Sequence, residues 1–183
     1  MTPPTLSAND VNRVRARIAR AHEIAAIQFR DAFVLGQTPP TAHLQMLADA
    51  LIGESEGIRL NGPAYEIRDG LIEPNYENFV VDRTPLTIFE YWVIISEITG
   101  SDSWRMTKVI TNPDEYDAAL KQMRSPQIVR ALVPSFSPSV DASMLSVVVY
   151  TRAGEERIER RQLFLDDRNE FHFHGRELIA EGR

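Results

Sequence analysis

The sequence predicts an α+β fold in which an N-terminal helical hairpin and further helices pack on a mainly antiparallel, strongly twisted C-terminal sheet. Two observations predict this class: helical periodicity dominates the first half, and three strand-like runs joined by short polar turns occupy the end. Helices followed by strands are typical of folds in which helices cover one face of an antiparallel sheet. We expect a single domain over residues 1–183. Within this domain we expect a helical region over 7–53, an acidic hairpin region over 57–82, a region of mixed helix and strand over 84–133 and an antiparallel meander over 144–180.

The first helix is expected from Ala8 to Leu35. Ser7-Ala-Asn-Asp10 has the pattern of a capping box with an aspartate in the third position after the cap. Apolar residues then recur at three- and four-residue steps: Val11, Val14, Ile18, Ala21, Ala25 and Phe29. At 1.5 Å per residue this helix would be about 42 Å long, so it must bend, project or pair with another copy.

A second helix is expected after Pro39-Pro40-Thr41, which stops the chain and caps the helix that follows. Its apolar stripe is Leu44, Leu47, Ala48 and Leu51, and Gly53 ends it. The short link between the two helices predicts an antiparallel hairpin.

Helical periodicity disappears from Gly57 to Asp82. The turn signals Asn61-Gly62-Pro63 and Asp69-Gly70 predict a small hairpin of Ala64–Arg68 and Leu71–Glu73. A further short strand is expected at residues 78–81.

Residues 85–99 are rich in β-branched and aromatic side chains, which favours a strand, but their flanks favour a helix. Thr84 is a good cap, Pro85 suits the first helical position, and Gly100 marks an end. We expect a buried helix, with a strand as the alternative. Strands are then expected at 104–110 and 127–133, a helix from Asn112 to Met123, and a loop over 134–141. The meander follows, with strands at 144–150, 157–165 and 170–179.

A long N-terminal helix followed by a C-terminal meander resembles the cone-shaped nuclear-transport-factor-2-like fold. The resemblance covers element order only, and the strand, helix, strand unit at 104–133 departs from it. No motif supports the family.

Composition excludes several classes of function. The net charge is −6, which argues against general nucleic-acid binding, and cysteine is absent, which excludes disulfides, thiolate metal sites and a cysteine nucleophile. The first residues have no secretory signal, and no apolar run approaches the roughly 18 residues that span a bilayer. We therefore expect a cytoplasmic protein without membrane contact. Lysine is much rarer than arginine, which fits a bacterial genome rich in G and C, where arginine codons are favoured.

His172 and His174 are the first candidates for chemistry, because two histidines one residue apart on a strand point to the same face. Two imidazoles can chelate a metal when a third ligand such as Glu177 completes the set, or act as an acid and base. The expected arrangement is an exposed face, with Phe171 and Phe173 pointing the other way into the core. We expect no bound metal and no cofactor.

Glu90 lies in the most apolar segment and becomes a candidate acid or base if it is buried, since burial raises a carboxyl pKa. Glu97 is seven residues further on and shares its helix face, which is most simply the face toward solvent. Tyr91, Trp92 and Trp104 are candidates to line an apolar ligand pocket, or else belong to the core. Asp166-Asp167 is expected in a turn.

Nucleotide-binding and standard hydrolase motifs are absent. We therefore expect a cytosolic protein that binds a protein partner or a small apolar ligand without catalytic chemistry of its own. The alternative is a small-molecule isomerase, dehydratase or hydrolase using His172 and His174. The apolar residues in the last turns of the first helix, which spread over more than one face, predict a homodimer.

Overall fold

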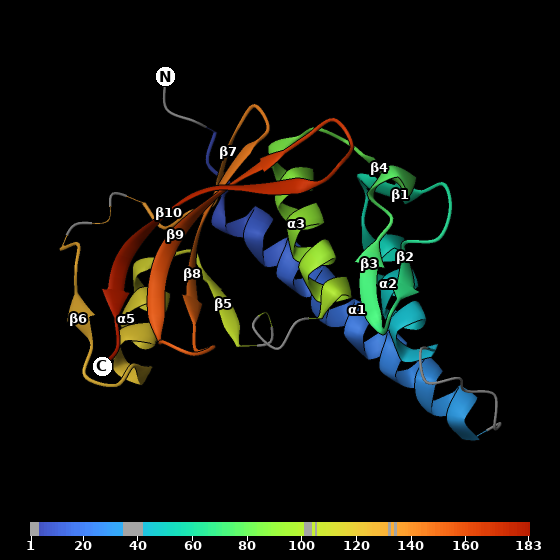
Figure 1. The fold of residues 1–183 in the computed structure, drawn as a ribbon, viewed down its shortest axis with the longest axis horizontal. Helices are drawn as coiled ribbons and strands as arrows, with labels where there is room; N and C mark the ends of the chain where they lie inside the picture. The colour runs from blue at the N-terminus through green and yellow to red at the C-terminus, as the bar shows by residue number, and fades with distance from the viewer. Residues whose placement is uncertain (1–3, 35–41, 101–103, 105, 132, 134) are drawn as a thin grey trace.

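A computed structural model describes residues 4–34, 42–100, 104, 106–131, 133 and 135–183. Its helices are α1 (Ala8–Val34), α2 (Ala42–Glu54), the 3-10 turn η1 (Tyr76–Asn78), α3 (Pro85–Thr99) and α5 (Pro113–Gln122). Its strands are β1 (Ile58–Leu60), β2 (Tyr65–Arg68), β3 (Leu71–Pro74), β4 (Phe79–Val81), β5 (Thr107–Ile110), β6 (Gln127–Ile128), β7 (Ser139–Asp141), β8 (Met144–Thr151), β9 (Arg157–Leu165) and β10 (Phe171–Glu181). The predicted α+β class is confirmed (Figure 1).

The main sheet is antiparallel and strongly curled (Figure 1). Its strands lie in the order β5-β8-β9-β10-β6, and the short β7 pairs with β8. The predicted meander forms its centre, because β8, β9 and β10 pair in sequence order. β5 pairs with β8 and forms one edge of the sheet.

Side chains of β8 enter two different hydrophobic clusters, according to the face on which they lie. Val147 and Val149 join the larger cluster with α1, α2 and α3, whereas Val148 and Tyr150 join a smaller one with α5. Because successive side chains of a strand point to opposite faces, α5 covers the face opposite α1 and α3. The expectation that helices cover one face was therefore wrong in this detail, and both faces of β8 are buried.

The predicted signals position α1 and α3. The Ser7 hydroxyl accepts a hydrogen bond from the Asp10 amide at 3.1 Å, and the Asp10 carboxylate accepts from the Ser7 hydroxyl at 2.8 Å. Thr84 caps α3 by accepting from the Thr87 amide at 3.2 Å, and Gly100 ends the helix at φ 53°. The helix alternative for 85–99 is confirmed, and ten of its residues are buried.

The acidic segment forms two small two-stranded sheets. β2 pairs with β3 through the predicted turn, where Asp69 and Gly70 adopt positive φ angles of 51° and 79°. The predicted short strand forms β4, which pairs with β1.

Several strands differ from the prediction. β6 ends at Ile128, because the amides of Val129 and Arg130 both donate to the Ile179 carbonyl and the regular ladder stops there. The expected loop at 134–141 contains β7, whose Val140 is buried opposite Leu145 of β8. Near Trp104, the described strand begins only at residue 107. Residue 35, the expected helix end, lies outside the described residues.

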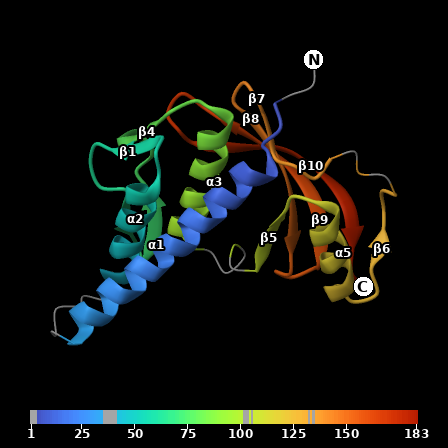
Figure 2. The ribbon, with the colours of Figure 1, turned by 180° about the vertical axis from the view of Figure 1, so that it is seen from behind.

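The C-terminal end of α1 projects away from the main sheet, with α2 packed along it (Figures 1 and 2). Within the described ranges, no helix combines the length and apolar character needed to cross a membrane.

Candidate functional site

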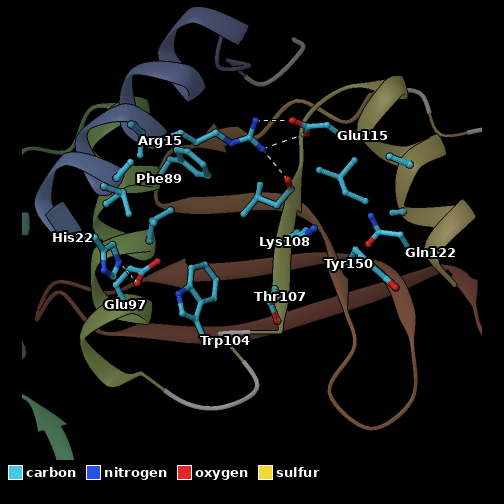
Figure 3. A pocket seen from close by; sticks show the side chains of 18 residues that line it. Arg15, His22, Phe89, Glu97, Trp104, Thr107, Lys108, Glu115, Gln122 and Tyr150 are labelled. Atoms are coloured by element: carbon cyan, nitrogen blue, oxygen red, sulfur yellow. Dashed lines mark hydrogen bonds and ion pairs between the residues drawn. The ribbon is translucent and has the colours of Figure 1, made fainter. Parts of the chain in front are cut away.

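A cavity of about 500 Å³ lies beside the β5 edge of the main sheet (Figure 3). It is lined by residues of α1, α3, β5 and α5, together with Trp104 and Tyr150. Most of its wall is apolar, formed by Val14, Ile18, Ala19, Phe89, Val93, Trp104, Val109, Ile110, Ala118 and Ala119. Its polar lining residues are Arg15, His22, Glu97, Thr107, Lys108, Glu115, Gln122 and Tyr150. A mainly apolar cavity with a few polar groups is the usual form of a small-molecule site.

Arg15 and Glu115 join α1 to α5 across the cavity (Figure 3). The Arg15 guanidinium donates to both carboxylate oxygens of Glu115, at 2.6 and 3.3 Å, and also to the Val109 carbonyl at 2.9 Å. Burial raises the pKa of Glu115, but the hydrogen bonds from Arg15 and Thr111 and the Arg15 charge outweigh it, so the pKa lies below its ordinary value. Arg15 therefore also satisfies the Val109 carbonyl, a backbone acceptor on the edge strand β5.

His22 and Glu97 join α1 to α3 at the opposite end of the cavity (Figure 3). The His22 Nε2 atom lies 2.9 Å from Glu97 Oε2. The hydrogen bond to Glu97 raises the His22 pKa; partial burial opposes the rise and the Glu97 charge adds to it. Glu97 does share a helix face with Glu90, but this face is turned toward α1 and not toward solvent as expected.

Glu90 is buried beside the cavity and pairs with Arg17 of α1. Its side chain is 4% exposed and that of Arg17 is 17% exposed. The Arg17 Nε atom is also buried and has no hydrogen-bond partner among the described residues. Glu90 does not line the cavity, so the pair links two packed helices.

The three aromatic candidates divide between core and cavity. Tyr91 is fully buried, and its hydroxyl donates to the Asn169 carbonyl at 2.8 Å, so burial keeps it protonated by raising its pKa. Trp92 is buried and packs edge-on against Trp104, with ring centroids 5.3 Å apart. Trp104 alone of the three lines the cavity.

His172 and His174 are exposed on β10 and do not line the cavity. A β-bulge falls between Phe173 and Gly175, so regular alternation is interrupted at His174. Phe173 is 61% exposed, which corrects the expectation that it points into the core; Phe171 does pack against Tyr91.

His172 contacts Asp166 in the β9–β10 turn, with Nε2 and Oδ2 2.8 Å apart. Asp166 also accepts from the Arg168 and Glu170 amides, as expected for a turn aspartate. The hydrogen bonds from His172 and from the Glu170 and Arg168 amides, together with the His172 charge, lower the Asp166 pKa, while desolvation opposes the shift. Asp166, Glu170 and His172 place one ligand atom each within 4.8 Å of one another, and the turn contacts account for the positions of Asp166 and His172.

The sequence did not predict that these lining residues come together in one cavity. Its polar residues come from α1, α3, β5, α5 and β8, and no short motif joins them. Only Trp104 and Glu97 were singled out from sequence, the second as a solvent-facing residue.

Comparison of the chain with protein-family models, curated proteins and solved structures found no match.

Proposed function

We propose that this protein binds a small, mainly apolar molecule in the cavity beside β5, without catalytic chemistry of its own. The observation that carries the proposal is the cavity itself, about 500 Å³ in volume with a predominantly apolar wall. This volume lies within the range of roughly 300–1,000 Å³ that is usual for small-molecule sites.

The charged residues around the cavity support binding over catalysis. Arg15 is paired with Glu115 and His22 with Glu97, so these groups brace the helices around the cavity. Neither of these two pairs includes a hydroxyl that its base could activate as a nucleophile. The exposed positions of His172 and His174 give the enzyme alternative no support.

An apolar fluorophore provides the first test. We expect N-phenylnaphthylamine to bind the purified chain saturably, with enhanced fluorescence, because the cavity excludes water from its aromatic rings. Ala19 and Ala118 are exposed residues that line the cavity from α1 and α5. Replacing Ala19 with Trp should narrow the cavity and weaken binding at least about tenfold.

Ala16→Trp is the matched control, because Ala16 is an exposed residue of the same helix that does not line the cavity. Both substitutions carry the same cost in helix propensity, about 0.5 kcal/mol. Saturable binding that Ala19→Trp weakens and Ala16→Trp leaves unchanged supports the proposal. No saturable binding, or equal weakening by both substitutions, contradicts it.

We also propose that the chain forms a homodimer in the cytoplasm. The projecting end of α1 supports self-association, since Ile27 on this part of the helix is 51% exposed. Phe29 in the same region is partly buried. The absence of cysteine fits a reducing compartment.

A further inference from the structure

We infer that the molecule bound beside β5 carries a single acidic group on an apolar body, and that Lys108 and Tyr150 bind this group. The inference rests on the proposed function and specifies the class of ligand. It follows from a difference between the two ends of the cavity.

At the end formed by α1 and α3, the polar groups already satisfy one another. His22 and Glu97 are paired there, and the remaining wall is apolar, with Phe89, Val93 and Trp104 (Figure 3). An apolar part of a ligand fits this end because it leaves no polar group without a partner.

At the end formed by β5, β8 and α5, polar groups are left over. Tyr150 is only 1% exposed, and its buried hydroxyl has no hydrogen-bond partner among the described residues. A buried polar atom without a partner is rare and calls for a specific explanation, such as a ligand. Burial raises the Tyr150 pKa, and the Glu156 charge adds to the rise while Arg152 opposes it, so the phenol keeps its proton and donates.

Lys108 supplies a charge at the same place. Lys108 and Tyr150 are opposite one another in the β5–β8 register, so their side chains project from the same face of the sheet. Among the described residues, no hydrogen bond or ion pair holds the Lys108 ammonium. Of the described residues that line the cavity, three are basic and two are acidic, so with His22 protonated one positive charge has no counterpart among them.

Lys108 and Tyr150 also lie between an apolar and a polar environment. They line a second, polar hollow of about 970 Å³ as well as the apolar cavity. The other walls of this hollow are mostly charged and include Arg124, Arg152, Glu155, Glu156 and Glu181. An amphiphile fits such a boundary, with its body in the apolar cavity and its acidic group at Lys108 and Tyr150.

Calorimetric titration of the full chain with decanoate, decanamide and decanol tests the inference. We expect decanoate to bind at least about tenfold more tightly than decanamide or decanol, because a hydrogen bond to a charged group contributes more than one to a neutral group. Lys108→Met and Tyr150→Phe should each remove most of this preference. Tyr150→Phe should leave the melting temperature unchanged or raise it, since the hydroxyl it removes has no partner in the protein.

Lys121→Met and Tyr116→Phe are the matched controls, because both residues lie on α5 outside the cavity lining. They should retain the full preference for decanoate. Equal binding of decanoate and decanamide, or a preference that Lys108→Met and Tyr150→Phe leave intact, overturns the inference while the proposed function stands. If none of the decyl compounds binds and N-phenylnaphthylamine does not bind either, the proposed function fails as well.

Discussion

At the scale of single residues, the buried Arg17–Glu90 pair has the largest energetic consequence. Removing one partner of a buried ion pair leaves a charge in a poorly solvated place, which costs roughly 3–5 kcal/mol. Both side chains lie between packed helices, and Glu90 is nearly inaccessible to solvent.

We therefore predict that Arg17→Met lowers the free energy of unfolding by about 3 kcal/mol. Combining it with Glu90→Met should recover most of the loss, because no buried charge then remains. Urea unfolding of the two single variants and the double variant measures this coupling.

Arg13→Met is the control, because Arg13 is 54% exposed and lies 3.9 Å from the exposed Glu56. It should cost less than about 1 kcal/mol. A double variant less stable than Arg17→Met would show that the pair stabilises the fold directly.

The His22–Glu97 pair makes stability depend on pH. A histidine pKa that is raised in the folded protein contributes stability that is fully present below the unfolded value, here 6.5, and lost as pH rises through the folded pKa. The stability difference between the wild type and His22→Gln should thus shrink as pH rises through this window. Since both side chains are partly exposed, the difference should not exceed about 1 kcal/mol. Thermal unfolding across this pH range checks the direction, and a difference that grows with pH is inconsistent with the pairing.

At the scale of secondary-structure elements, α3 shows what local sequence can predict. Thr84, Pro85 and Gly100 act within one turn of the helix ends, so they outweigh the strand preference of the β-branched residues between them. β7 was missed because its pairing of Val140 with Leu145 depends on β8 more than on its own short sequence. The helical hairpin, the acidic hairpin and the meander were also predicted, because their signals likewise lie within or next to each segment.

The α3 cap gives a prediction at this scale. Thr84→Ala removes the acceptor for the Thr87 amide and should destabilise the protein by about 1 kcal/mol. Thr84→Ser keeps the hydroxyl and should retain most of the stability. Chemical denaturation compares the two, and equal losses would assign the effect to the lost methyl group instead of the cap.

At the scale of the whole molecule, the candidate site depended on tertiary structure and could not be predicted. Arg15 and Glu115 are one hundred residues apart, and Glu97 lies far along the chain from its partner His22. Neither pair follows from a local spacing in the sequence. They become walls of one cavity only because α1 packs against α3 and Arg15 of α1 reaches Glu115 of α5.

The projecting end of α1 leads to a prediction of self-association. We expect sedimentation equilibrium across micromolar concentrations to give a homodimer, because exposed apolar residues such as Ile27 are covered by a second copy. Ile27→Glu should shift the equilibrium toward the monomer. A wild-type mass of 20.8 kDa at every concentration would refute the dimer.

Intermolecular nuclear Overhauser effects between methyl-labelled protein and N-phenylnaphthylamine test the ligand-binding proposal most directly. We expect contacts from the fluorophore to methyl groups of Val14, Ile18 and Val93, which line the cavity on α1 and α3. Contacts confined to exposed apolar residues remote from the cavity, such as Leu71 and Ile128, would show adsorption to the surface and contradict it.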